Sequence, residues 1–206
     1  MPSSCRGTWL LPLGAPTRYA ARMAIEREIK LRFETADDAR ARILSPAVGA
    51  TPLRCRRLQE DSLLDTPDGQ LFRRGVALRV RIESGRSLLT FKGPVQPGPL
   101  KLREEHETVV GDGHTTLTIL RELGLEVWFR YEKYREEFVA GDAVIAVDET
   151  PIGVFVEIES TEEGLIHETA AALGKGPDEY VKASYRSLFV EHCERCALPA
   201  ADMLFS

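Results

Sequence analysis

A short row of charged residues near the start of the chain has the spacing of a binding site built on a strand. Side chains alternate across a strand, so Glu26, Glu28 and Lys30 share one face, opposite the apolar Ile29 and Leu31. Adjacent carboxylates repel one another unless a cation lies between them, and a divalent metal is the usual one. Two interpretations stay open at this point: a metal site, or an amphipathic strand with its charged face in water.

The same alternation recurs along the chain, which favours a site over an ordinary surface. Charged residues spaced two apart follow in further segments: Arg79 and Arg81; Arg103, Glu105 and Glu107; Lys133 and Arg135; Glu157 and Glu159. Asp148 breaks an otherwise apolar strand in the same way. Carboxylates and basic groups buried together must be paired or metal-bound, so mixed signs on neighbouring strands favour an enclosed charged face.

The elements that must position these residues are short strands at close spacing, with few helices. This pattern predicts a β-dominated α+β fold whose antiparallel sheet closes toward a barrel or sandwich. Either the apolar faces meet in one core, or the charged faces line a lumen and the apolar faces carry helices; periodicity alone leaves both open. The predicted strands are 25–33, 54–64, 76–82, 87–92, 102–110, 127–139, 143–149 and 154–159, and the predicted helices are 35–44, 114–123, 162–173 and 180–196.

Bulk properties narrow the function. The chain has 206 residues and a net charge of −5, which argues against a general nucleic-acid binder but leaves room for a local basic pocket. No apolar run approaches the roughly 18–20 residues of a membrane span. Four cysteines indicate no disulfide scaffold, and we interpret Cys193 and Cys196 on the closing helix as incidental. A reducing cytoplasm fits this composition best.

The chain divides into three parts. Residues 1–24 carry arginines but no acidic residue, and their short apolar run is broken by Pro12. We interpret them as a disordered leader, or as one that is not made if Met23 is the true start. Residues 25–190 form the predicted domain, and residues 191–206 are the end of the closing helix and a tail.

Several blocks, taken in order, resemble the CYTH-domain proteins, also called triphosphate tunnel metalloenzymes. This family includes thiamine triphosphatases, inorganic triphosphatases and class IV adenylate cyclases. The similarity runs from about Ile25 to Leu188. The blocks are Glu26-x-Glu28-x-Lys30, Ala77-Leu78-Arg79-Val80-Arg81, Thr90-Phe91-Lys92-Gly93-Pro94, Arg103-Glu104-Glu105-His106-Glu107, Glu132-Lys133-Tyr134-Arg135, Val147-Asp148, Val156-Glu157-Ile158-Glu159 and Ser184-Tyr185-Arg186.

The resemblance implies an eight-stranded antiparallel barrel, flanked by helices, whose tunnel holds a triphosphate. Its basic residues would grip phosphate oxygens, as arginine forks do, and its acidic residues would hold one or two Mg²⁺ or Mn²⁺ ions through hard oxygen ligands. The implied phosphate-binding set is Lys30, Arg79, Arg81, Lys92, Lys133 and Arg135, with Arg103 as a helper. The implied metal ligands are Glu26, Glu28, Asp148, Glu157 and Glu159, with Glu105 and Glu107 also facing the lumen.

The resemblance names the scaffold and leaves the substrate open. Hydrolysis of inorganic tripolyphosphate, thiamine triphosphate or a nucleoside triphosphate is the leading interpretation, because it needs only water and the tunnel. The alternatives are a class IV adenylate cyclase, which makes cyclic AMP and pyrophosphate from ATP, and a non-catalytic triphosphate sensor. We expect a small-molecule triphosphate as partner, without nucleic acid or membrane, and a homodimer stays open. Neither Trp9 nor Trp128 matches the tryptophan of animal-type thiamine triphosphatases.

Overall fold

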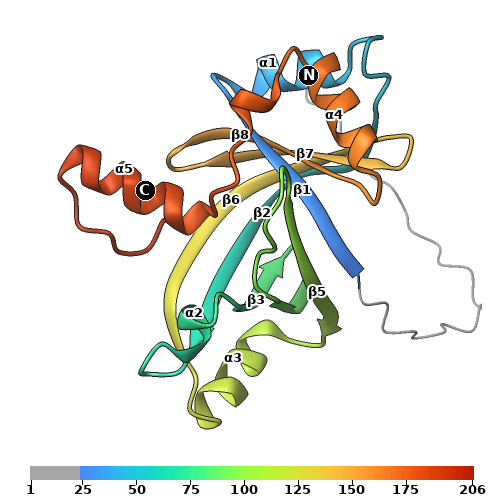
Figure 1. Cartoon of the computed structure of the whole chain (residues 1–206). Coiled ribbons are helices and arrows are strands. Elements are labelled where there is room, and N and C mark those ends of the chain that lie inside the picture. The colour runs from blue at the N-terminus through green and yellow to red at the C-terminus, as the bar shows by residue number, and fades with distance from the viewer. Residues whose placement is uncertain (1–23) are drawn as a thin grey trace, which may run out of the picture.

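Eight antiparallel strands close into a barrel, as predicted (Figure 1). The computed structural model describes residues 24–206, apart from the side chains of Ala24 and Glu26, so most of the predicted leader lies outside the described residues. Neighbouring strands follow the order β1-β5-β4-β3-β2-β6-β7-β8, and β8 pairs with β1. The strands are β1 (Ala24–Phe33), β2 (Thr51–Asp65), β3 (Ala77–Glu83), β4 (Arg86–Lys92), β5 (Lys101–Val110), β6 (Glu126–Ala140), β7 (Ala143–Thr150) and β8 (Gly153–Glu159).

Helices cover the outside of this barrel. Thr35 and Asp112 cap the first turns of α1 and α3 by accepting backbone N–H bonds, which explains where these helices begin. No helix within residues 24–206 is long and apolar enough to cross a membrane. The helices are α1 (Ala36–Ile43), α2 (Gln70–Arg73), α3 (Gly113–Glu122), α4 (Glu163–Ala172), a 3₁₀ turn η1 (Pro177–Glu179) and α5 (Tyr185–Cys196).

The apolar faces of the strands point outward and carry the helices, so the charged faces line the interior. One core cluster joins the outer faces of β1, β7 and β8 to α1 and α4, with Ile29, Ile145 and Ile158 fully buried. A second cluster packs Leu117 of α3 against Val80 of β3. Of the two arrangements that the alternation left open, the structure adopts the one with an enclosed charged lumen.

The closing helix begins later than predicted. The sequence predicted helix from Tyr180, but Val181 is extended and its N–H donates to the carbonyl of Lys30 on β1 at 2.8 Å. Helix α5 starts only at Tyr185, where the hydroxyl of Ser184 accepts the N–H of Ser187. The predicted helix start at residue 180 was therefore wrong for residues 180–184, because a strand-like contact with β1 holds this segment extended.

The C-terminal segment completes the wall of the barrel. Strand β7 pairs with β6 only from Tyr134 onward, which leaves the first half of β6 without a strand on that side. Met203 lies there: its N–H donates to the carbonyl of Arg130 and its carbonyl accepts the N–H of Glu132, both at 2.9 Å. The side chain of Met203 is fully buried. Residues 197–206 thus pack back onto β6 after α5 ends.

Candidate active site

A cavity of about 770 Å³ occupies the charged interior of the barrel. All seven basic residues that the sequence predicted line it, as do the predicted acids Glu28, Glu105, Glu107, Glu157 and Glu159. Asp148 is fully buried in the wall and contacts the basic residues that line the cavity. Glu26 lies on β1 opposite Arg103, and its side chain is outside the described part of the structure.

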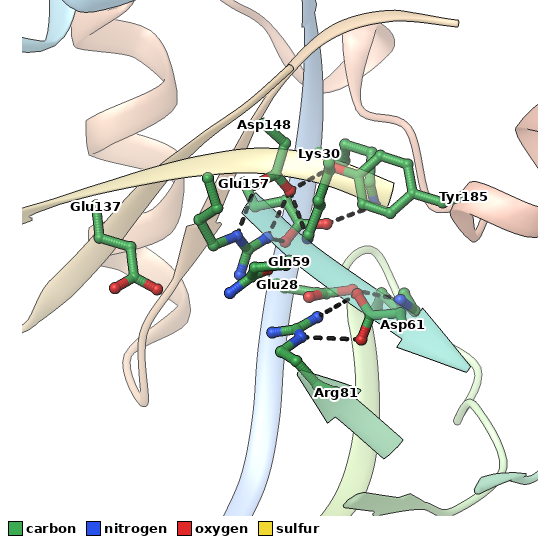
Figure 2. Close-up of polar contacts among 12 residues, drawn as sticks. Glu28, Lys30, Gln59, Asp61, Arg81, Glu137, Asp148, Glu157 and Tyr185 are labelled. Atoms are coloured by element: carbon green, nitrogen blue, oxygen red, sulfur yellow. Dashed lines mark hydrogen bonds and ion pairs between the residues drawn. The ribbon is translucent and has the colours of Figure 1, made fainter. Parts of the chain in front are cut away.

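Asp148 is the centre of the most deeply buried polar cluster (Figure 2). Strand register places Arg135 of β6 directly opposite it on β7, and the guanidinium Nε donates to Asp148 Oδ1 at 2.7 Å. The ammonium of Lys133 donates to Oδ2 at 2.7 Å, and the hydroxyl of Tyr185 donates to the same oxygen at 2.6 Å. One carboxylate thereby fixes two cations and the first turn of α5.

Glu157 holds a second pair of cations beside this cluster. It lies opposite Lys30 in the β1–β8 ladder, with 3.0 Å between its Oε1 and the lysine Nζ, and its Oε2 contacts Arg135. Burial alone would raise the pKa of Glu157, but Lys30 and Arg135 outweigh it and hold this pKa well below its ordinary value. The carboxylate therefore stays ionised at neutral pH.

At Lys133, burial and a neighbouring cation outweigh the attraction of the nearby carboxylate. Burial and the neighbouring Arg135 lower the pKa of Lys133 to about 8, although Asp148 opposes the shift. Burial likewise favours the neutral form of Asp148, but Arg135 and Lys133 keep the pKa of Asp148 below its ordinary value. Cations in this cluster outnumber the carboxylate that fixes them, so an added anion would be stabilised here.

Two arginines on β3 share a buried carboxylate that the sequence analysis missed. The guanidinium of Arg81 makes a bidentate interaction with the carboxylate of Asp61 on β2: Nε donates to Oδ1 at 2.9 Å and Nη2 donates to Oδ2 at 3.1 Å. The Nε of Arg79 lies 3.4 Å from the same Oδ1. Burial opposes ionisation of Asp61, but Arg81 and Arg79 outweigh it and lower the Asp61 pKa. Gln59 and Asp61 alternate as the recognised charges do, and this alternation was the available signal.

Lys101 is the second residue that was missed. Its ammonium contacts Glu28, a predicted metal ligand, and register pairs the two residues across β1 and β5. Lys101 stands two positions before Arg103, so the alternation along β5 could have revealed it. Lys92 of β4 contacts Glu105, which lies opposite it on β5. The guanidinium of Arg103 donates to the backbone carbonyl of Lys92 at 2.9 Å.

The remaining missed residues lie around Glu83 on β3. The amide of Gln59 donates to Glu83 at 2.6 Å and Arg57 donates to it at 2.9 Å. Glu107, by contrast, was predicted, and it accepts the hydroxyl of Thr90 at 3.0 Å. The carboxylates of the interior are therefore held by ion pairs and hydrogen bonds in several clusters.

Carboxylates that could take part in metal binding meet between β1 and β8. Glu28 lies directly opposite Glu159, and both line the cavity. Among the side chains that the structure describes, which do not include that of Glu26, no three acidic, histidine or cysteine residues group into a metal site. Mg²⁺ is usually held by one or two carboxylates together with substrate phosphates and water, so the Glu28–Glu159 pair fits a metal shared with a bound phosphate chain.

The fold and the site together define a closed, eight-stranded antiparallel barrel whose lumen is lined by charged side chains of both signs. Residues 24–184 match the CYTH domain family, and the chain belongs to this family. A Methanocaldococcus jannaschii protein named "putative adenylate cyclase" is 27% identical over 143 residues, which cover 65% of this chain and 82% of that protein.

Solved structures share the fold. A Vibrio parahaemolyticus protein described as a "putative adenylate cyclase" superposes with a TM-score of 0.70 at 20% identity, over 81% of this chain and 98% of that one. A Pyrococcus horikoshii protein gives 0.67 at 26% identity, over 81% and 99%. A Hippeastrum protein, described as a "putative adenylyl cyclase" that reveals a dominant triphosphatase activity, gives 0.62 at 21% identity, over 81% and 96%.

Proposed function

We propose that this protein is a metal-dependent hydrolase that cleaves the terminal phosphate from a triphosphate held inside the barrel. The proposal includes a small-molecule substrate, Mg²⁺ or Mn²⁺ as cofactor and a location in the cytoplasm. The observation that carries it is the excess of positive charge around one cavity of about 770 Å³, which twelve basic and eight acidic residues line. Such a volume is within the range of small-molecule sites, and so many cations call for a highly charged anion.

The geometry of the arginines supports phosphate as that anion. Arg79 is buried, and its Nε makes no hydrogen bond to any described residue although it lies near Asp61. A buried donor without an acceptor is costly, and a phosphate oxygen entering the cavity would accept from it. Arg81 and Arg135 are already oriented by carboxylates, so little side-chain entropy remains to be lost when the anion binds.

In the proposed reaction, water attacks the terminal phosphorus and the bond to the bridging oxygen breaks, which releases orthophosphate and the shortened phosphate chain. Lys30, Lys133 and Arg135 stabilise the charge that collects on the transferring group and on the leaving oxygen. Glu28 and Glu159 would hold the metal, which would supply further charge neutralisation when bound. Their carboxylates also provide acceptors that can orient the attacking water.

A class IV adenylate cyclase is the second candidate. Two of the similar proteins carry adenylate cyclase in their names, and this supports the alternative. In a cyclase the ribose 3′-hydroxyl would attack the α-phosphorus and pyrophosphate would leave. The same charged lumen serves both reactions, which differ in the phosphorus that faces the nucleophile.

The test is an end-point assay of the purified chain with Mg²⁺ or Mn²⁺, offering tripolyphosphate, thiamine triphosphate and ATP separately. Orthophosphate without cyclic AMP is the expected result. Cyclic AMP with stoichiometric pyrophosphate would overturn hydrolysis in favour of the cyclase. Tight binding without turnover would instead indicate a triphosphate sensor.

A further inference from the structure

Two large aromatic side chains stand exposed where the charged cavity opens. Phe72 of α2 is 66% exposed and Trp128 of β6 is 38% exposed, and their ring centroids lie 5.6 Å apart at an angle of 70°. Both rings line the same cavity as Lys92 and Arg79. Exposed aromatic rings are costly in water, and rings that border a polar site commonly form one wall of a ligand pocket.

A break in the strand pairing sets the position of Trp128. Leu63 of β2 pairs with Phe129 and Leu64 pairs with Val127, so Trp128 is the extra residue of a bulge. Bulges re-aim side chains and are frequent beside active sites. The bulge lets Val127 pack under α3 and Phe129 pack against Leu188 of α5 and Met203, while Trp128 lines the cavity.

Arg186 ties this aromatic patch to the phosphate-binding interior. Its guanidinium carbon lies 5.2 Å from the ring centroids of Trp128 and Phe129, and it also lines the cavity. The preceding residue, Tyr185, donates its hydroxyl to Asp148 at 2.6 Å. The aromatic patch and the deepest anion-binding cluster are thus connected through one turn of α5.

We propose that Phe72, Trp128 and Arg186 form a subsite for the base of a nucleoside triphosphate, so that the preferred substrate is organic. This inference rests on the proposed function, which supplies the triphosphate in the lumen. Aromatic faces and guanidinium planes both stack on nucleobases. A neutral base tolerates the fixed positive charge of Arg186, whereas the cationic thiazolium of thiamine triphosphate is repelled by it.

The experiment compares kcat/KM for ATP, thiamine triphosphate and tripolyphosphate in the wild type, Trp128→Ala, Trp128→Phe and Phe72→Ala. Trp128→Ala is expected to lower the ATP-to-tripolyphosphate ratio about ten-fold, and Trp128→Phe is expected to keep most of it. Leu123→Ala removes an apolar side chain that is 73% exposed and outside the cavity lining, and serves as the control with an unchanged ratio. An unchanged ratio in Trp128→Ala overturns the subsite, and an equal loss for thiamine triphosphate overturns the preference for a neutral base.

Equilibrium binding separates this inference from the proposed reaction. The probes are β,γ-methylene ATP, which carries a base, and methylenediphosphonate, which does not, titrated calorimetrically into the wild type and Trp128→Ala. If no substrate is hydrolysed but Trp128→Ala weakens only the ATP analogue about ten-fold, the hydrolase proposal fails and the subsite stands. If hydrolysis occurs and both probes bind Trp128→Ala as they bind the wild type, the subsite fails and the hydrolase stands.

Discussion

Glu28 lies directly opposite Glu159 across the ladder that joins the first and last strands of the barrel. Like charges at directly opposed positions destabilise a sheet unless a cation compensates them. On the other side of Glu28, the ammonium of Lys101 already contacts its carboxylate. A divalent cation bound at this pair would relieve the repulsion between the two carboxylates.

The first prediction concerns this pair. Mg²⁺ should stabilise the wild type against unfolding, by about 2.7 kcal/mol at a concentration one hundred times its Kd. Glu28→Gln should lose most of this gain and lower kcat at least 100-fold, because it removes one of the charged oxygen ligands. Thermal unfolding with and without Mg²⁺, together with turnover, measures both effects.

The matched control for this prediction is Glu122→Gln, which removes an exposed carboxylate at the end of α3. It should retain both the stabilisation by Mg²⁺ and the activity. Near-normal turnover of Glu28→Gln at saturating Mg²⁺ would remove Glu28 from the metal site.

Lys92 allows the phosphate contacts to be separated from the metal contacts. Lys92→Ala should raise KM for the triphosphate about ten-fold or more, because a charge-assisted bond to a phosphate oxygen is lost. The Mg²⁺ concentration needed for half-maximal activity should stay the same. Steady-state kinetics over a grid of substrate and Mg²⁺ concentrations gives both values.

Lys175→Ala, which removes a partly exposed lysine that is paired with Glu179 and lies outside the cavity lining, is the control for the loss of one positive charge. A weaker response to Mg²⁺ with an unchanged KM in Lys92→Ala would contradict the assignment of Lys92 to phosphate.

The strand pattern predicted much of the interior because side chains in a strand alternate strictly. Arg79 and Arg81 on β3, and Lys133 and Arg135 on β6, all line the cavity as their spacing required. Asp61 escaped notice because the run around it carries polar residues on both faces, so the alternation there is unclear. Which carboxylate pairs with which cation also depends on register between strands distant in sequence.

The start of α5 shows a second reason why the sequence alone did not predict the whole structure. The sequence from Tyr180 is compatible with a helix, and the structure delays the helix to Tyr185 because Val181 pairs with β1. That contact joins residues about 150 positions apart, and local propensity carries no information about it. The Ser184 cap was a local signal, but it marks a helix start only after the preceding residues are known to be extended.

The next prediction concerns the contribution of Asp61 to the free energy of unfolding and how this contribution depends on pH. Asp61→Asn leaves Arg79 and Arg81 buried without their carboxylate and should lower the free energy of unfolding by about 3 kcal/mol at pH 7. The folded pKa of Asp61 is below its unfolded value of about 3.9, so its contribution is complete above that value and is lost as the pH falls through the folded pKa. Urea unfolding between pH 3 and pH 7 measures the difference.

The exposed Asp178 provides the control for Asp61, since Asp178→Asn removes the same charge from the surface. It should differ little from the wild type at any pH. A difference between Asp61→Asn and the wild type that is equally large at pH 3 and pH 7 would show that the lost charge is not the cause.

Substitution of Met203 tests whether the C-terminal segment is part of the barrel wall that positions the site. Its side chain is fully buried in a cluster with Tyr185 and Tyr131, so Met203→Ala should cost about 2–5 kcal/mol of unfolding free energy. The neighbouring Leu204 is 39% exposed, and Leu204→Ala should cost far less. Because Tyr185 also orients Asp148, loosening this cluster should weaken binding of tripolyphosphate as well. Loss of stability with unchanged affinity would show that the segment covers the barrel without positioning its site.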